Sequence, residues 1–435
     1  MIARVYSPRT GCNYLCNKIY YNVIVSLPDL QAAKKNDRDI LFFFLGAIVY
    51  MFGFILAYWL PITKAQLVQA LALVPVLYFG VKLAAIQTNE PYLKIMFTLF
   101  MISNAIIILR IDGFNYGKIK DYLFSDFRFW PYLVPFTAFF VNKPFFFGRL
   151  FKMIFWFGLF FIFLSVISWK GYIATTAIAE LSIGIFACAS GLILLTWPYH
   201  NLSKKIVATA ALLLALYVSA VLARRNIILT TAGFIIFSYL SYFFFMRDKA
   251  TKKFLSLYAV AIIMIGGISF FAGRKNSSFK LLAGRAKDDT REYVFDQYFL
   301  SMENSMWMGK GIDGTYYCPL VTEYIDIDPV EYRDLIECGY LQVMLKGGAV
   351  NLFFLLAILV PAVILGVFFS NNFFSKGCGM LIFLWLVDMG PYGLPAFSLR
   401  YILVWICVGV CYDKRIRSMG EASIRKFIAL PVPNN

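Results

Sequence analysis

Long apolar runs, each able to cross a lipid bilayer, dominate this chain. Of its 435 residues, 60% are hydrophobic and 15% are charged, whereas soluble domains are about 45–50% apolar and about 25% charged. Roughly 20 apolar residues in a helix cross a bilayer core, so the runs predict an all-α polytopic membrane protein of about twelve spans. These are expected near residues 40–60, 67–87, 95–110, 129–141, 151–168, 181–197, 206–223, 227–246, 254–273, 338–370, 377–390 and 398–412.

The expected spans divide the chain into five parts. The N-terminal part has no apolar run followed by a small-residue cleavage site, so we do not expect a signal peptide. One long polar loop separates the earlier spans from the later ones. The parts are the N-terminal segment 1–39, the first nine or so spans in 40–273, the large loop 274–337, the last spans in 338–412 and a basic tail, 413–435.

Lysine and arginine gather in alternate loops. The N-terminal segment, NKPFFFGRLFK, PYHNLSKK, RDKATKK, NNFFSKG and DKRIRSMGEASIRK are basic, whereas PITKAQ, SWKGYIATTAIAE and PYGLPAFSLR each carry one basic residue. Basic loops stay in the cytoplasm. We therefore expect a multi-pass protein of the cytoplasmic (inner) membrane with both termini inside. The large loop would then lie outside, in the periplasm if the cell has two membranes.

Two expected outer segments are more basic than this rule requires. Arg110 is followed by loop 111–128, which carries three basic residues, and Arg224 and Arg225 stand together between two spans. Basic residues on the outer side do not help orientation. An anionic substrate is the natural reason for them, because guanidinium groups bind phosphate and carboxylate well.

The large loop opens with a dense charge cluster, GRAKDDTREYVF, at residues 284–295. A helix is expected to begin near Asp289, with Glu292 three residues later as a capping partner. Arg285 and Arg291 flank that start, where cations oppose the helix dipole by about 0.3–1 kcal/mol each. The carboxylates have two open interpretations, a helix cap or acid–base groups. The arginines are better explained by an anion that they clamp.

The large loop ends in YRDLIECGYLQVMLKGG. Here Arg333 and Glu337 are four residues apart at the expected start of a span. A helix would place them one turn apart, as a surface salt bridge worth about 0.3–0.5 kcal/mol. Alternatively, Glu337 is a functional carboxylate on the same side as Arg224 and Arg225.

Metal and nucleic-acid chemistry are not expected. The chain has eight Cys but a single His, His200, so no Cys/His zinc cluster can form. We expect neither metal nor cofactor. The net charge of +17 is explained by basic cytoplasmic loops rather than by nucleic-acid binding. Cys318 and Cys338 both fall on the expected outer side, where a disulfide and two free thiols are both open.

Several short motifs recur in one known family. LARRNIIL, GR…DDTREYVF, GKGIDGTY, ECGYLQVMLKGG and the closing LPAFSLRYILVWICVGVC together resemble the O-antigen polymerase/O-antigen ligase superfamily, over roughly residues 40–415. The resemblance implies a membrane glycosyltransferase of the GT-C type with one large extracytoplasmic loop. Such enzymes take glycan from an undecaprenyl diphosphate carrier without nucleotide sugar, metal or other cofactor.

The resemblance also implies partners and site residues. The partners would be the undecaprenyl-diphosphate-linked oligosaccharide, the lipid bilayer and a chain-length regulator protein, with no nucleic acid. Outer arginines would bind the diphosphate, and a residue at the start of the span after the large loop would activate the acceptor hydroxyl. The expected catalytic residues are Glu337, Arg291 and Arg285, and the expected substrate-binding residues are Arg224, Arg225, Arg333 and Arg110.

One departure from the family separates its branches. The ligase branch commonly has a His in the pattern H-x-x-Y-L, whereas this chain has Glu337 before Tyr340 and Leu341, and His200 lies in an expected inner loop. The sequence therefore favours a surface-polysaccharide polymerase acting by glycosyl transfer. A ligase-like transferase that uses a carboxylate stays open. A lipid-linked oligosaccharide flippase is the alternative from another class, although it would need basic residues in mid-membrane rather than a large loop.

Overall fold

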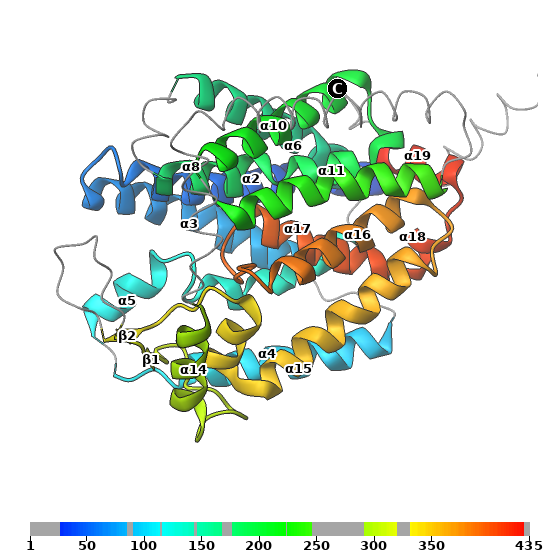
Figure 1. Ribbon diagram of the computed structural model, residues 1–435. Helices are drawn as coiled ribbons and strands as arrows, with labels where there is room; N and C mark the ends of the chain where they lie inside the picture. Colours follow the sequence, from blue (N-terminus) through cyan, green and yellow to red (C-terminus); the bar gives the residue numbers. More distant parts are fainter. Residues whose placement is uncertain are drawn as a thin grey trace, which may run out of the picture.

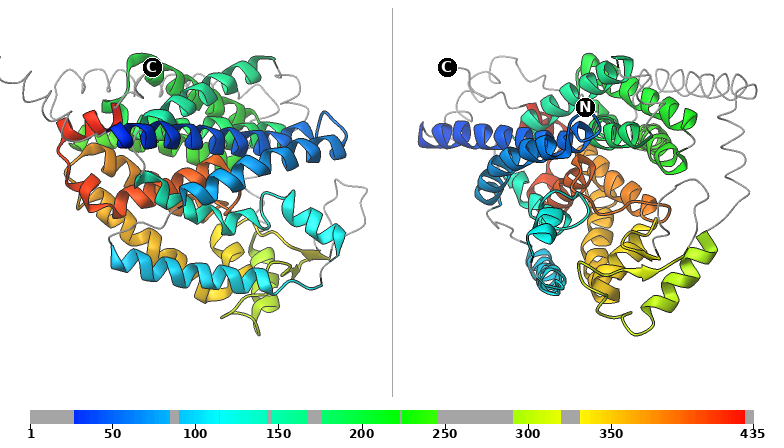
Figure 2. Two further views of the ribbon diagram at one scale, coloured as in Figure 1. Left: turned by 180° about the vertical axis from the view of Figure 1, so that it is seen from behind. Right: turned by 90° about the vertical axis from the view of Figure 1, so that its left-hand side faces the viewer.

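The computed structural model describes residues 27–84, 90–113, 115–142, 146–167, 176–222, 224–245, 291–319 and 331–429. Most of the helices run broadly along one direction and form a bundle (Figure 1). At one end, called the loop end here, lie α5 (Tyr116–Leu123) and the strands β1 (Tyr316–Tyr317) and β2 (Tyr332–Arg333). At the opposite end, called the tail end, lie α18 (Lys414–Ser418) and α19 (Glu421–Ala429). Figure 2 gives the view onto the loop end.

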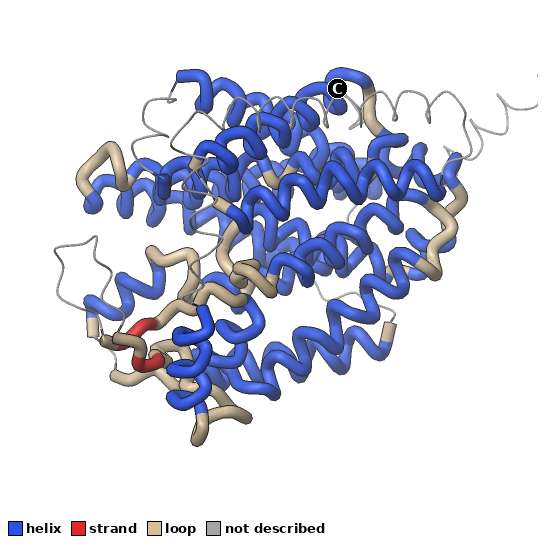
Figure 3. Tube along the Cα trace, in the orientation of Figure 1, coloured by secondary structure: helices blue, strands red, loops and turns tan. Residues whose placement is uncertain are grey.

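Eight helices of the described part are long and apolar enough to cross a membrane. Together with the dominance of helix over strand in Figure 3, this confirms an all-α membrane protein. The expected span near 254–273 lies outside the described residues. The eight are the Arg38–Leu56 part of α2 (Leu27–Leu56), α3 (Ile62–Leu83), α4 (Pro91–Leu109), α6 (Phe146–Ile167), Ala177–Leu195, α10 (Leu202–Val221), the Arg225–Phe243 part of α11 (Arg225–Phe245) and α15 (Gly339–Val367).

Three further apolar elements are shorter than a bilayer crossing. The expected span near 129–141 is a run of 3-10 helix, η1 (Trp130–Tyr132) and η2 (Val134–Asn142), and the last two expected spans are α16 (Phe373–Asp388) and α17 (Leu399–Tyr412). Every residue of α17 except Arg400 is buried. This helix is therefore enclosed by its neighbours, and its length is set by protein packing rather than by the lipid.

The outward faces of the long helices are apolar. On α3, Leu67, Leu71 and Val74 are 62%, 67% and 66% exposed at helical spacing, and α4 and α6 carry similar stripes. Monomeric soluble proteins rarely leave apolar patches of this size in water. Lipid chains are the surroundings that such faces fit.

The described part of the large loop folds into a small cap over the loop end. It contains α14 (Arg291–Met302), and β1 pairs antiparallel with β2, with Tyr316 opposite Arg333. Tyr298 and Tyr316 are almost fully buried beneath it. The cap thus has a hydrophobic core of its own, consisting of Tyr298, Met302, Tyr316, Cys318, Ile336 and Leu345.

The helix expected around Arg333 and Glu337 is not formed, which corrects that prediction. Arg333 lies in β2, and α15 begins at Gly339. The side chain of Gln342 explains the non-helical stretch, because its Oε1 accepts from the Ile336 amide at 3.0 Å and its Nε2 donates to the Asp334 carbonyl at 3.2 Å. Arg333 and Glu337 are therefore not one helical turn apart.

A break within α15 receives the glycine-rich part of the large loop. Gly348 has φ 69° and ψ −172°, which interrupts the helix. Backbone groups freed by such a break must find other partners away from water, and residues 306–311 supply them. The hydrogen bonds run from Lys310 N to Leu345 O (2.8 Å), Gly311 N to Lys346 O (2.9 Å), Ala349 N to Met306 O (2.8 Å) and Val350 N to Trp307 O (3.2 Å).

Candidate functional site

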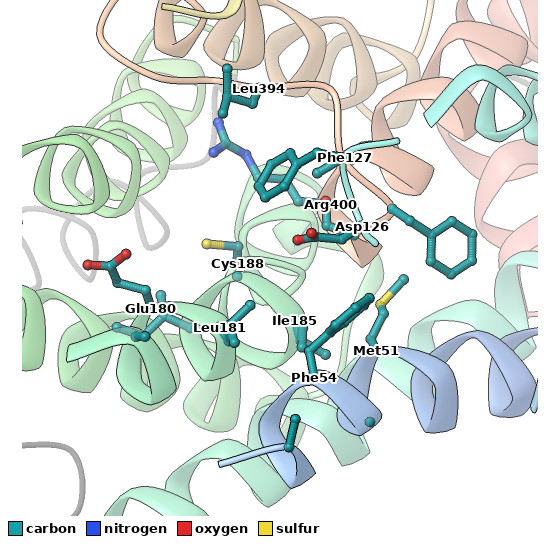
Figure 4. Close-up of a pocket in the computed structure, with 18 of the residues that line it drawn as sticks. Met51, Phe54, Asp126, Phe127, Glu180, Leu181, Ile185, Cys188, Leu394 and Arg400 are labelled. Carbon is teal, nitrogen blue, oxygen red and sulfur yellow. The ribbon is translucent and has the colours of Figure 1, made fainter. Parts of the chain in front are cut away.

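A cavity of about 550 Å³ lies toward the loop end of the bundle. Its walls come from α2, α3, α8 (Thr176–Ser182), α11, residues 124–127 and the connection from α16 to α17. Its volume falls within the roughly 300–1,000 Å³ typical of ligand sites. Figure 4 shows the cavity with Asp126, Glu180 and Arg400 around it. Its polar lining residues are Tyr58, Gln66, Gln69, Asp126, Glu180, Asn226, Thr230, Tyr392, Ser398 and Arg400.

Arg400 is held in the cavity wall by two neighbouring helices. Ser398 caps α17 by accepting from the Tyr401 amide at 3.2 Å, which places Arg400 in the first turn. Its Nη1 donates to Asp388 Oδ2 at 2.8 Å, and Thr230 donates to the other Asp388 oxygen at 2.7 Å. Nη2 of Arg400 is buried and has no hydrogen-bond partner among the described residues. The guanidinium is thus fixed by one nitrogen and has a donor left for a ligand.

Glu180 lies in the α8 wall and pairs with Arg224. The Arg224 Nε and Glu180 Oε1 atoms form an ion pair, which joins α8 to the start of α11. Directly after α8 the chain forms a π-helix, η3 (Ile183–Ala187), which also lines the cavity. Short π segments interrupt α-helices most often at functional sites.

Asp126 lies in the opposite wall, on the segment between α5 and η1. Its backbone carbonyl accepts from the Phe397 amide at 2.8 Å, which ties this segment to the α16–α17 connection. Burial raises the pKa of the Asp126 carboxyl to about 7. A group with this pKa exchanges protons near neutral pH, as a general acid or base must.

Tyr392 lines the cavity together with Asp126 and Glu180. Burial raises the pKa of the Tyr392 hydroxyl, and the nearby charges of Glu180, Asp126, Glu337 and Asp388 raise it further, in that order. Glu337 is exposed and is not part of the cavity lining. Two residues further on, Gly339 packs against Gly393 of the lining, where an added Cβ would lie 2.6 Å from the Gly393 carbonyl oxygen, so Glu337 lies near the rim of the cavity.

The predicted site residues are only partly brought together. Arg224 and Glu337 lie at the cavity edge, and Arg225 is exposed as the first residue of α11, next to the lining residue Asn226. Arg291 begins α14, but its side chain is outside the described part. Arg285 lies outside the described residues altogether.

Arg110 and Arg333 have positions within the cap. Arg110 Nη1 donates to the Met308 carbonyl at 2.7 Å and so holds the loop that docks on α15. Arg333 is part of β2 and pairs in register with Tyr316. Arg110 thus links the end of α4 to the cap, and Arg333 belongs to the strand pair of the cap.

Two basic residues of the first outer loop, Lys118 and Arg128, have internal partners. Asp313 Oδ1 accepts from Arg128 Nη1 at 3.2 Å, and Asp313 Oδ2 lies 3.4 Å from Lys118 Nζ. Tyr122 also donates to this carboxylate. Burial alone would raise the pKa of Asp313, but these hydrogen bonds hold it below its usual range. Arg128 continues to Asp334 at 2.8 Å, so the network fastens the first loop to the cap.

Among the described cysteines, Cys188 is a buried thiol that lines the cavity (Figure 4), whereas Cys318, Cys338 and His200 are not part of its lining. Cys318 and Cys338 are free, buried thiols. His200 is buried near the tail end, where its Nε2 lies 2.8 Å from Thr196 Oγ1. Among the described residues, no group of three or more His, Cys, Asp or Glu side chains is placed to hold a metal ion.

Sequence reasoning missed three residues of the cavity lining, Glu180, Arg400 and Asp126, and also Asp388, which binds Arg400. Asp388 lies inside an expected span and Glu180 directly before another, and charged residues within membrane spans usually mark functional sites. That signal was present for both. In the sequence, Arg400 serves only as the one basic residue of the outer loop PYGLPAFSLR. Asp126 is one of several charged residues in a basic loop.

The fold and the cavity define an all-α membrane protein. Toward one end of its helix bundle lies this cavity, called the polar cavity here, whose lining includes the carboxylates Asp126 and Glu180 and the guanidinium of Arg400. Comparison with protein families, with curated proteins and with solved structures finds no match to this chain.

Proposed function

We propose that the protein is a surface-polysaccharide polymerase that transfers glycan from an undecaprenyl diphosphate carrier to a sugar hydroxyl on the outer face of the membrane. One observation carries the proposal: the large cavity toward the loop end combines a fixed arginine donor, Arg400, with a carboxylate, Asp126, that titrates near neutral pH. These are the groups needed to stabilise a departing diphosphate and to take a proton from an attacking hydroxyl.

The reaction needs no redox partner. The acceptor oxygen forms a bond to the anomeric carbon while the bond from that carbon to the diphosphate oxygen breaks, and the bonding pair leaves with the diphosphate. The hydroxyl proton passes to a carboxylate. Attack opposite the leaving group inverts the anomeric configuration.

Two carboxylates compete for the role of base. Glu337 is the residue that the family resemblance assigns, and it lies near the cavity rim. Asp126 lines the cavity itself and has a pKa of about 7, close to the value at which a base is most effective at neutral pH. The geometry favours Asp126.

Arg400 is the cation best placed for the diphosphate. Its buried Nη2 is available to a ligand while Nη1 remains on Asp388. Arg224 would have to share or exchange Glu180 to reach the same ligand. Arg225, Arg285 and Arg291 remain further candidates from the sequence for the approach of the anionic head group.

The alternatives differ in acceptor or in chemistry. A ligase-like transferase would use the same donor groups with a different acceptor. A flippase is supported less, because the polar lining of the cavity lies toward one end of the bundle rather than along a path through it.

The test is turnover by the purified protein in liposomes with the lipid-linked glycan extracted from its native membrane. A ladder of longer lipid-linked glycans, with release of undecaprenyl diphosphate, is expected. Transfer to a lipid acceptor in a single step without a ladder would indicate a ligase. Movement of intact donor across the bilayer without bond cleavage would overturn the proposal in favour of a flippase.

A further inference from the structure

A second cavity, of about 350 Å³, runs between α3, η1, η2 and α17. Its floor is buried and aromatic, with Phe43 and Phe140 among the side chains. Its mouth is formed by Leu77 and Val81 on α3, which are 45% and 77% exposed. Because these residues lie on the lipid-facing side of α3, the cavity is a groove that opens toward the lipid.

The groove offers a ligand nothing but hydrocarbon contact. Thr137 is the one lining residue with a polar side chain other than the indole of Trp130, and both are already bonded internally. The Thr137 hydroxyl donates to Val134 O at 2.8 Å, and Trp130 Nε1 donates to Leu123 O at 2.8 Å. A polar ligand in the groove would lose its hydrogen bonds to water without replacement. Only an apolar chain fits such a lining.

The groove adjoins the polar cavity. Phe397 lines both spaces, so they meet at a single aromatic side chain. From Phe397 the groove continues along η2 and α3 as far as Ala84, just beyond the tail end of α3. A lipid with its head group in the polar cavity would have its chain begin beside Phe397, at the top of this groove.

We propose that the groove binds the isoprenoid chain of the lipid-linked donor whose diphosphate occupies the polar cavity. The proposal rests on the proposed function for the nature of that head group. The occupant is the donor's own chain rather than a membrane phospholipid, because only a chain joined to a head group in the polar cavity is directed into the groove at Phe397. Gly80 leaves room in the wall, where an added Cβ would be 3.3 Å from Phe43.

The first experiment uses the unaltered protein in nanodiscs with an undecaprenyl diphosphate that carries a diazirine in its first isoprene units. Labelled peptides are expected from α3 around Leu77 and Val81 and from η2. Excess unlabelled undecaprenyl diphosphate should abolish the labelling, and excess phospholipid should not. Labelling that phospholipid removes equally well would show that the groove holds bulk lipid, which overturns the proposal.

A pair of variants locates the chain. Val81→Trp fills the mouth of the groove, while Val74→Trp adds the same bulk two turns away on the same exposed face, outside the lining. Excluding even two methylene groups costs about tenfold in binding. We therefore expect Val81→Trp to lower photolabelling about tenfold and Val74→Trp to leave it unchanged. Equal effects of the two would overturn the proposal.

The labelling does not depend on turnover, so the two proposals fail separately. Specific labelling of the groove without any polymer formation would leave the binding site standing and remove the polymerase. Polymer formation with no labelling of α3 or η2 would keep the polymerase and remove the groove.

Discussion

Arg400 and Asp388 form an ion pair of 2.8 Å that joins the start of α17 to the end of α16 in the wall of the polar cavity. The Asp388 side chain is 4% exposed and that of Arg400 is 17% exposed. A pair this deeply placed has a structural role as well as the binding role proposed for the arginine. Stability and binding must therefore be measured separately.

Arg400→Met is expected to destabilise the protein strongly, because it leaves the Asp388 carboxylate buried without its cation, at a cost of about 3–5 kcal/mol. The double variant Arg400→Met/Asp388→Leu removes both charges and should recover most of that stability. Donor binding should stay lost in the double variant. Thermal unfolding and binding of labelled undecaprenyl diphosphate measure the two effects, and normal binding by the double variant would exclude Arg400 as a diphosphate ligand.

The raised pKa of Asp126 predicts a pH dependence. A base must be deprotonated, so the transfer rate should rise as the pH passes upward through about 7, the pKa of this carboxyl. Asp126→Asn should lose about 10²–10⁴-fold in rate, and its residual rate should not rise near that pH. Asp121→Asn, at an exposed position on α5, is the matched control. If the pH profile of Asp126→Asn is the same as the parent's, another group is the general base.

The same shift has a consequence for stability. Because the folded-state pKa of Asp126 is raised above its ordinary value, the folded protein binds this proton more tightly than the unfolded chain does. The resulting stabilisation of the folded state is present at low pH and is lost as the pH rises through about 7. The free energy of unfolding of Asp126→Asn, compared with that of the parent, should therefore be higher above pH 7 than it is at acidic pH. If the variant and the parent differ in free energy of unfolding by the same amount at both pH values, this prediction is wrong.

Docking of the cap on the broken helix depends on Gly348. Its φ of 69° is in the left-handed region, and an added Cβ would lie 2.1 Å from the Trp307 carbonyl oxygen. Gly348→Ala should cost at least the 1–2 kcal/mol of a left-handed residue, and it should expose residues 303–311 to protease. Gly420→Ala, where no atom lies within 4 Å of the added Cβ, is the control. If both variants unfold at the parent's temperature, the break is not fixed by this contact.

The orientation expected from the basic loops can be tested with exposed positions at the two ends. Tyr332 is 60% exposed at the loop end, and Ser418 is exposed at the tail end. The Cys residues of the described part are buried, so a background without Cys12 and Cys16 should react little. In intact spheroplasts, an impermeant thiol reagent should label Tyr332→Cys, and it should label Ser418→Cys only after lysis. The reverse pattern would place the large loop inside.

Much of the helical framework was predictable, because an apolar segment in lipid must satisfy its backbone within a helix. The span expected near 95–110 is α4 (Pro91–Leu109), and the one near 206–223 is α10 (Leu202–Val221). Boundaries moved by a few residues where caps decide them. Asn201, for example, starts α10 by accepting from the Lys204 amide.

Features that depend on distant partners were not predictable. The expected continuous span near 338–370 contains the break at Gly348, which is satisfied by residues 306–311. The pairing of Arg128 in the first outer loop with Asp313 was not predicted, because the two residues are 185 positions apart in the chain. Helical spacing relates residues that are close in sequence, so it cannot predict such a pair.

The residues of the candidate site also divide into those that the sequence reveals and those that only the packed structure reveals. Acidic residues within or next to apolar runs, such as Asp388 and Glu180, are visible in a sequence and could have been selected. Asp126 could not, because its raised pKa comes from burial, which only the packed structure supplies. Glu337 was chosen by resemblance, and its position near the rim leaves its role to experiment.

Glu337→Gln is the substitution that decides between the two carboxylates. Gln keeps the size of the side chain but cannot take a proton at neutral pH. Because Glu337 is exposed and outside the cavity lining, we expect this variant to turn over donor within about threefold of the parent, far less than the loss of a general base. The measurement is single-repeat turnover by purified protein in liposomes, beside Asp126→Asn at equal protein abundance. If Glu337→Gln loses about 10²-fold or more in turnover rate while Asp126→Asn stays near the parent's rate, Glu337 is the general base. The acceptor sugar would then bind at the rim of the cavity.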